Sequence, residues 1–293
     1  MNTIEYMKRS LIWGIVLMIT ISCQNNPPEG FLILPISEKL AQEMRIKNVF
    51  DDRSPVSVDR LRLIRLRYID FDDQDQEGEI VVLDACAQQV QQIFIELYQK
   101  RFALAQVKLL TAYNGSDSLS MLANNTSGHN FRAIAGTERL SLHSYGTAID
   151  INPVNNPLVD IPCEDSLGIA QFEPITGIKY ANRMENRLGK TNRQGMAEAA
   201  VEVFARNGFY WWGGYWNCPI DYQHFQLSRS VSELLAIMES EEAILFFKIL
   251  QEYYNDHQQP IEDALEAKIG ETVDFKDAYL QDPEGFIQMV GKL

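Results

Sequence analysis

Four side chains in two distant stretches of this chain could together form a catalytic metal site. His143 and Asp150 lie seven residues apart in the decapeptide Ser141–Asp150, and His224 follows Asp221 by three residues. Imidazole nitrogens and carboxylate oxygens are suitable zinc ligands, and a catalytic zinc takes three protein ligands and keeps one position for water. We therefore expect His143, Asp150 and His224 to bind one Zn²⁺, with Asp221 beside the metal as the base that the water needs.

The alternative interpretation is that these histidines are merely structural, as a single histidine in a folded protein usually is. Two separate clusters of suitable residues in one chain argue against it. The remaining histidines, His129 and His257, have no comparable neighbours, so we expect neither to bind metal. His129 is nevertheless close enough in sequence to reach the rim of a cleft.

The decapeptide itself predicts how its two ligands meet. Strand segments over Leu140–His143 and Ala148–Ile151, joined by a tight turn, would carry both side chains to one point. Gly146 suits the turn because glycine adopts backbone conformations that other residues resist. A last strand that ends at Phe225 and Leu227 would bring in the third ligand.

The residues before the decapeptide predict a β-hairpin followed by an amphipathic helix, because apolar residues recur there at strand and then at helical spacing. The expected elements are a strand over Leu61–Phe71, an acidic turn over Asp72–Glu77, a strand over Glu79–Leu83, a helix over Ala85–Arg101 with Asp84 as its N-cap, and a strand over Val107–Ala112.

The residues after the decapeptide predict a long loop and then mostly helices. The proline-containing loop suits the lining of a substrate site, and the last helices carry the usual capping signals. The expected elements are an irregular segment over Asn152–Tyr180, a helix over Arg193–Asn207 stopped by Gly208, a helix toward Tyr254 opened by Ser230 and Glu233, and a helix over Pro260–Ile269 that ends at Gly270.

A second metal pattern overlaps the acidic turn. Acidic residues from Asp73 to Asp84 fall at the first, third, fifth and twelfth positions of an EF-hand calcium loop, with Gly78 at the sixth. The flanking residues favour strands over helices, and position twelve normally carries the longer Glu. We therefore favour a solvated acidic turn over a calcium site.

The composition excludes one class of partner. The net charge is −14, whereas a nucleic-acid-binding face needs clustered Lys and Arg. The charge does not identify a substrate, and an acidic soluble surface accounts for it.

The N-terminus predicts export. Lys8 and Arg9 precede an apolar run over Leu11–Ile21, which is short for a membrane span and ends at Ser22-Cys23. This pattern is typical of a bacterial lipoprotein signal that is cleaved before a lipidated cysteine. We expect residues 1–22 to be removed and Cys23 to anchor the protein to a membrane of the cell envelope, with no other membrane contact.

Three cysteines remain beyond Cys23. Cys86 lies on the apolar face of a predicted helix, so we expect a buried free thiol. Cys163 and Cys218 lie in loop-like surroundings, and an exported chain can form disulfides. They are the candidate pair.

The residues around the expected metal ligands resemble a known family. Ser-x-His-x-x-Gly-x-Ala-x-Asp over 141–150, followed by the acidic residue-x-x-His of 221–224, is similar to the signature of VanY-like D-alanyl-D-alanine peptidases, a family of zinc enzymes that includes VanX dipeptidases and L-alanyl-D-glutamate endolysins. The run Gly208–Trp216 resembles the Gly-Phe-x-Trp-Gly-Gly-x-Trp segment of the carboxypeptidase and endolysin branches. The resemblance covers residues 60–227.

The resemblance implies an α+β fold of the kind shared by D-Ala-D-Ala peptidases and hedgehog-like zinc proteins, with a small, mainly antiparallel sheet flanked by helices. It implies zinc ligation by His143, Asp150 and His224, and general-base catalysis by Asp221, where many relatives carry Glu. The chain then divides into a signal peptide (1–22), a tether (23–45), a zinc metallopeptidase domain (46–228) and an acidic helical extension (229–293).

The resemblance also implies substrate-binding positions at Ser141, Tyr113 and Trp212. Many relatives carry a Tyr-Arg pair upstream, and here Tyr113 is followed by Asn114. Arg132 is our candidate for the missing cation, with a structural arginine as the alternative. Trp212 and its neighbouring tryptophans could wall the cleft or pack in the core.

The function implied by the resemblance is zinc-dependent hydrolysis of peptidoglycan stem peptides. Carboxypeptidase cleavage at D-Ala-D-Ala is the main expectation, and endopeptidase cleavage between L-Ala and D-Glu is the first alternative. The second alternative is a lipoprotein that holds zinc and binds the cell wall without cutting it. Asp221 favours an enzyme, because a binding protein needs no base there.

Overall fold

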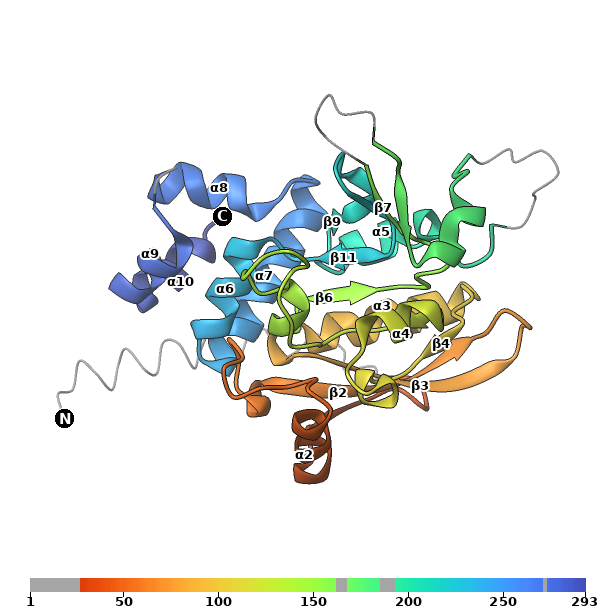
Figure 1. Cartoon of the computed structure of the whole chain (residues 1–293). Coiled ribbons are helices and arrows are strands. Elements are labelled where there is room, and N and C mark those ends of the chain that lie inside the picture. The colour runs from red at the N-terminus through yellow and green to blue at the C-terminus, as the bar shows by residue number, and fades with distance from the viewer. Residues whose placement is uncertain (1–26, 162–167, 185–192, 271–272) are drawn as a thin grey trace.

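The computed structural model describes residues 27–161, 168–184, 193–270 and 273–293 (Figure 1). Small, mostly antiparallel sheets lie among helices, and further helices follow at the C-terminal end. The predicted α+β class is therefore confirmed. None of the described helices is long and apolar enough to cross a membrane.

The first sheet contains the predicted hairpin. Its strands are β1 (Leu32–Pro35), β2 (Leu61–Ile69) and β3 (Asp75–Leu83), in the order β1-β2-β3. β3 begins inside the expected acidic turn. The carboxylates of Asp73 and Asp75 form ion pairs with Arg101 and Arg67 across this end of the hairpin. The strand flanks and these ion pairs fit the solvated turn and not an EF-hand.

The expected tether over residues 23–45 is wrong for its second half. β1 pairs with β2, and helix α2 (Glu38–Ile46) follows it. Phe31 and Met44 are each only 1% exposed and belong to the main hydrophobic core. Burial of these apolar side chains makes the segment part of the folded domain.

Helix α3 (Ala87–Gln99) matches the predicted amphipathic helix and packs its apolar face in the main core. Cys86, just before it, is a buried free thiol, as predicted. Asp84 does not cap this helix. Its buried carboxylate accepts hydrogen bonds from Arg60 Nε at 2.7 Å and from Ser240 Oγ at 2.6 Å. Asp84 therefore joins the hairpin to the C-terminal helices.

Three smaller sheets follow, and all are antiparallel except a two-stranded parallel pair. The strands are short, so loop conformation positions most of the surrounding residues. The sheets comprise β6 (Ala148–Asp150), β11 (His224–Gln226) and β9 (Trp211–Trp212); β10 (Ile220–Asp221), β7 (Leu158–Asp160) and β8 (Gln171–Glu173); and the parallel pair β4 (Gln106–Val107) and β5 (Asn125–Thr126).

Two predicted strands are wrong. Residues 140–143 contribute to a 3-10 helix over Leu142–Tyr145, and residues 107–112 give way to another over Leu110–Tyr113. Sheet pairing is limited to the first residue of each stretch, since Leu140 forms only an isolated bridge with Ala133 and Val107 ends β4, and the Ser141 side chain caps the first of these turns. The local hydrogen bonds therefore determine the conformation more strongly than β-propensity does.

The segment Asn152–Tyr180 is less irregular than expected, because it contains β7, β8 and a 3-10 helix over Ile175–Tyr180. Asn152 and Asn156 tie its first part to the body: their Nδ2 atoms both donate to Gly195 O, at 3.1 and 2.9 Å. The following helix, α5 (Val201–Arg206), is shorter than predicted.

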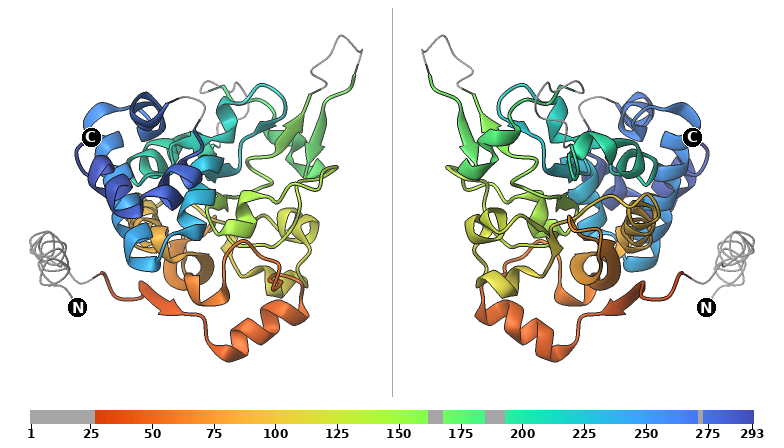
Figure 2. Two further views of the ribbon diagram at one scale, coloured as in Figure 1. Left: turned by 90° about the vertical axis from the view of Figure 1, so that its left-hand side faces the viewer. Right: turned by 90° about the vertical axis from the view of Figure 1, so that its right-hand side faces the viewer.

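The C-terminal extension is helical, as predicted, and it packs on the preceding part of the chain (Figure 2). Phe246, Phe247 and Ile261 are fully buried in the main core. Ser228, and not Ser230, caps the first helix, because its hydroxyl accepts the hydrogen bond from Val231 N. The helices are α6 (Arg229–Ile237), α7 (Ser240–His257), α8 (Ile261–Ile269), α9 (Phe275–Gln281) and α10 (Pro283–Val290).

Candidate metal centre

Two of the predicted ligands are direct cross-strand neighbours. β6 and β11 pair antiparallel in a register that places Asp150 opposite His224. Opposed residues of such a pair have Cβ atoms about 5 Å apart, so their side chains meet on one face. A second contact, the antiparallel bridge between Ser127 and Asp150, holds the other edge of β6.

His143 reaches the same point from a 3-10 turn. Ser141 Oγ accepts the hydrogen bond from His143 N at 3.3 Å and caps the turn, and Gly146 ends it at φ +70°. A Cβ atom on Gly146 would lie 2.6 Å from the backbone nitrogen of Leu83. Glycine is therefore required here both by the dihedral angle and by the closeness of the first hairpin.

The hydrogen bonds of each imidazole indicate which nitrogen faces the metal position. His143 Nδ1 donates to the carbonyl oxygen of Gly128 at 2.7 Å, which leaves Nε2 for a metal. His224 Nε2 lies 2.8 Å from Gln226 Oε1, so its other nitrogen, Nδ1, faces Asp150. Partners of this kind commonly fix the tautomer and orientation of ligating histidines.

The three side chains form a dense, buried set of charges. Asp150 Oδ1 lies 2.8 Å from His224 Nδ1, and Asp150 Oδ2 lies 3.1 Å from His143 Nε2. Burial alone would raise the pKa of Asp150, but the two imidazoles outweigh it and hold that pKa below its ordinary value. Burial opposes the charge on His224, yet Asp150 raises its pKa to about 9.

This donor set fits Zn²⁺. One ligand atom from each of His143, Asp150 and His224 lies within 4.8 Å of the others. His143 Nε2 is buried, and although Asp150 Oδ2 lies 3.1 Å away, the geometry between them is not that of a hydrogen bond, so Nε2 has no hydrogen-bond partner among the described residues. A buried polar atom without a partner is costly, and coordination of a metal would satisfy it. Two imidazoles and one carboxylate are an established zinc ligand set.

Asp221 lies next to this set, at the end of β10. It is 8% exposed, and its Oδ1 has no hydrogen-bond partner in the described part of the chain. The pKa of Asp221 is raised to about 6, chiefly by burial; His224 opposes this shift and the charge of Asp150 adds to it. Gly213 packs against it so closely that a Cβ atom there would lie 2.4 Å from Asp221 O.

The other predicted site residues have contacts of their own in the described part of the chain. The guanidinium of Arg132 pairs with Asp117 at 3.0 Å, and burial, with a smaller electrostatic effect of Tyr68, raises the pKa of Tyr113. Ser141 is only 5% exposed and acts as the cap described above. Their predicted roles with substrate therefore stay predictions.

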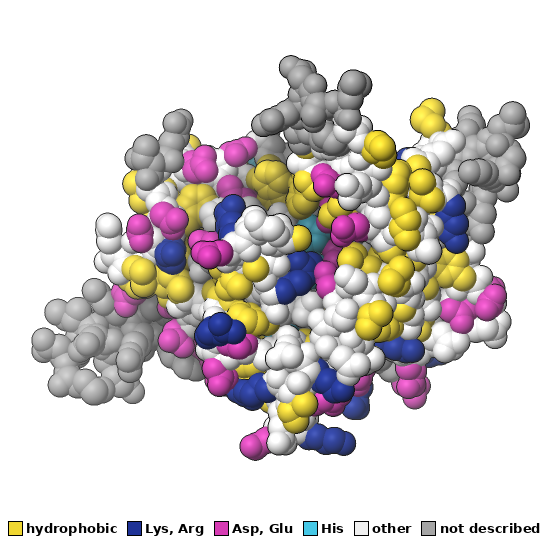
Figure 3. Space-filling view, viewed as in Figure 1, with side chains coloured by type: hydrophobic (Ala, Val, Ile, Leu, Met, Phe, Trp, Pro, Cys, Tyr) yellow, Lys and Arg dark blue, Asp and Glu magenta, His cyan; other side chains and the backbone are white. Residues whose placement is uncertain are grey.

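The tryptophan run divides between the core and the site. Trp212 is 6% exposed, stacks on Phe225 and donates its indole N–H to Tyr222 O, so it is a core residue. The ring of Trp216 lies 5.6 Å from that of His224 and is the tryptophan beside the ligands. A histidine is visible on this face between acidic and basic side chains (Figure 3).

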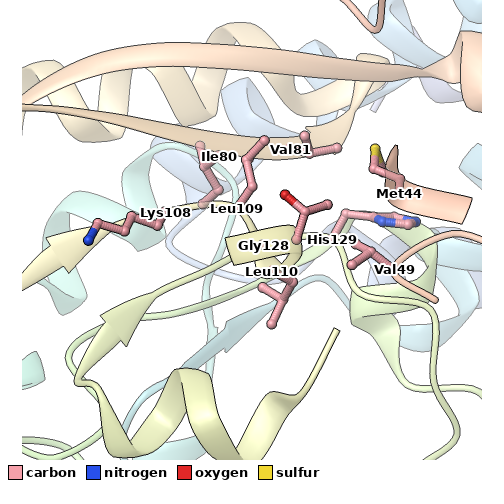
Figure 4. A pocket seen from close by; sticks show the side chains of 10 residues that line it. Met44, Val49, Ile80, Val81, Lys108, Leu109, Leu110, Gly128 and His129 are labelled. Atoms are coloured by element: carbon pink, nitrogen blue, oxygen red, sulfur yellow. The ribbon is translucent and has the colours of Figure 1, made fainter. Parts of the chain in front are cut away.

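Among the described residues, His129 lies outside the group that could hold a metal ion. It is 3% exposed and lines a small cavity of about 10 Å³ together with Met44, Val49 and Ile80 (Figure 4). Burial is the main reason that the pKa of His129 falls to about 3. His129 is therefore a neutral, buried residue of the interior.

Sequence reasoning missed the two groups that orient the imidazoles. Gly128 acts through its backbone carbonyl, which no residue pattern reveals. Gln226 lies two residues after His224, and alternation along a strand places both side chains on the same face. That spacing was a usable signal.

The cysteine and export predictions fall largely outside the described residues. Cys218 is disulfide-bonded, whereas its predicted partner Cys163 lies outside the described residues. The signal segment 1–22 and Cys23 also lie outside them. The Cys163–Cys218 pairing and the lipid anchor stay predictions.

Comparison with known proteins supports the same site. Residues 135–227 match a family model described as D-alanyl-D-alanine carboxypeptidase. The match covers less than half of the chain but contains the decapeptide, Asp221 and His224. No curated protein and no solved structure matches the chain significantly.

Proposed function

We propose that this protein is a zinc-dependent hydrolase of peptidoglycan stem peptides, with D-alanyl-D-alanine carboxypeptidase activity as its main reaction. The observation that carries the proposal is the convergence of His143, Asp150 and His224 within the segment that is similar to D-alanyl-D-alanine carboxypeptidases. This substrate would place the protein in the bacterial cell envelope, in line with the predicted lipoprotein signal.

The chain's own residues supply the acid–base chemistry. When bound, Zn²⁺ would activate water and polarise the peptide carbonyl. Asp221 accepts a proton from the attacking water and returns it to the leaving amine. Its raised pKa of about 6 suits this exchange, because the carboxylate is still ionised at neutral pH and is more basic than an ordinary aspartate. Its unpartnered Oδ1 is free to accept that proton.

The second candidate is endopeptidase cleavage between L-Ala and D-Glu. A carboxypeptidase benefits from a cation that binds the terminal carboxylate of the substrate. Asn114 stands where relatives carry arginine, and Arg132 is engaged by Asp117 at 3.0 Å. An endopeptidase needs no such cation, so this ion pair favours the second candidate.

The test is digestion of purified muropeptides by the zinc-loaded protein, with products weighed by mass spectrometry. Loss of one D-Ala supports the carboxypeptidase, and release of a longer stem fragment supports the endopeptidase. Asp221→Asn should keep its zinc and lose about 10²–10⁴-fold in kcat. His143→Ala should lose both zinc and activity. Unchanged muropeptides would favour a non-catalytic wall-binding protein, and full activity in Asp221→Asn would exclude Asp221 as the base.

A further inference from the structure

A concave surface is lined in part by the tryptophan run. This groove has a volume of about 470 Å³, within the usual range for small-ligand sites. We call it the tyrosine groove and define it by six of its lining residues: Trp212, Tyr215, Tyr254, Glu202, Arg206 and Gln258. These residues come from α5, from the 3-10 helix Gly213–Tyr215 and its flank, and from the end of α7.

The tyrosine groove and the metal centre share one segment of chain. Trp216 lies beside His224, and Gly213 packs against Asp221. Trp212 and Tyr215, which belong to the same segment of chain as Gly213 and Trp216, line the groove. A substrate long enough to pass this segment could therefore occupy both places.

Three aromatic rings line the groove. Tyr215 is 67% exposed and meets Trp212 edge-on, with ring centroids 5.0 Å apart. Tyr254 stacks on Tyr210 at 4.6 Å, which fixes its plane. In the described part of the chain no hydrogen bond reaches the hydroxyl of Tyr215 or of Tyr254. The groove therefore combines flat apolar faces with polar groups that are free for a ligand.

The charged side chains at the groove already have partners. Glu202 pairs with Arg206 at 3.5 Å, and Arg206 also forms an ion pair with Glu96. The lining residue Glu198 is engaged by Arg183. An ionic ligand would have to displace these pairs, so the groove favours a neutral ligand with flat faces and many hydroxyl or amide groups.

A sugar ring has this chemistry. We propose that the tyrosine groove binds neutral N-acetylated amino-sugar units of the glycan strand, so that the metal centre acts on stem peptides still attached to glycan. The inference rests on the proposed function, since it names the form of the substrate that the same protein takes. It adds a binding site next to the metal centre along the same segment of chain.

The first test measures sugar binding directly. The purified full chain, with and without zinc, is titrated with a neutral N-acetylglucosamine tetrasaccharide while tryptophan fluorescence and binding heat are recorded. Saturable binding is expected in both states. Tyr215→Ala should weaken it about tenfold, equivalent to about 1.4 kcal/mol, and Tyr215→Phe, which keeps the ring, should change it less than threefold. Failure of the unaltered protein to bind the sugar would overturn the proposal.

The second test compares two substrates with the same stem peptide, one free and one carrying its disaccharide. Tyr215→Ala should raise KM about tenfold for the glycan-linked substrate and leave kcat and both constants for the free peptide unchanged. Equal effects on both substrates would overturn the proposal, because the groove would then act through the fold. Sugar binding without any peptide hydrolysis would refute the proposed function and not the groove.

Discussion

Replacing Gln226 by Leu should weaken zinc binding without removing any ligand. Gln226 Oε1 lies 2.8 Å from His224 Nε2, and this contact keeps the proton on Nε2 and the lone pair on Nδ1, which faces Asp150. Leucine has a similar size but accepts no hydrogen bond. Loss of a partner of this kind typically lowers metal affinity 10–100-fold, which corresponds to about 1.4–2.7 kcal/mol.

The assay is competition for zinc between the protein and a chromophoric chelator, with metal content checked by elemental analysis. Gln226→Glu is the matched control: it retains an acceptor, and a charged one binds the N–H more strongly, so its affinity should equal or exceed that of the unaltered protein. Activity of Gln226→Leu should return when zinc is in excess. If Gln226→Leu binds zinc within twofold of the unaltered protein, Gln226 does not fix the tautomer and the ligand assignment for His224 is wrong.

Two further predictions concern stability. Gly146→Ala should lower the free energy of unfolding by about 2 kcal/mol or more, because its φ is +70° and the new Cβ would lie 2.6 Å from the backbone nitrogen of Leu83. Gly136→Ala, at φ +74° with open space around it, should lower that free energy by only about 1 kcal/mol. Equal losses for the two variants in urea titrations would contradict the steric argument. Folding lowers the pKa of buried His129 from 6.5 to about 3. Below pH 6.5 the unfolded chain therefore binds a proton that the folded chain does not, so the free energy of unfolding decreases as the pH is lowered, by about 2 kcal/mol at pH 5. In metal-free protein His129→Leu should lack this loss and exposed His257→Leu should retain it; the same pH profile in both variants would exclude His129 as its source.

The convergence of the candidate metal ligands could be predicted from the sequence because ligand chemistry restricts residue type and spacing severely. His143, Asp150 and His224 converge as expected, although their local structure differs from the prediction. The 3-10 turn that carries His143 replaces an expected strand. A set of side chains that converge in space can therefore be inferred from residue types even when the secondary structure of one supporting segment is predicted wrongly.

Predictions that depended on contacts between distant residues were less successful. Asp84 has the residue type of a helix cap, but Arg60 and Ser240 engage it instead. Arg132 was the candidate for the missing cation, with a structural arginine as the alternative, and its ion pair with Asp117 could not be foreseen from the sequence. Local patterns cannot identify these partners, because nothing in the neighbouring residues specifies which distant side chain will be near.

The sequence alone determined the chemical identity of the candidate site, since the imidazoles, the carboxylates and the required Gly146 are properties of residue type. Tertiary structure decided everything that depends on proximity: which nitrogen of each histidine faces the metal position, which tryptophan lies beside His224, and how far burial raises the pKa of Asp221. Desolvation and hydrogen-bond geometry arise only when remote segments pack together, so they have no local signature in the chain.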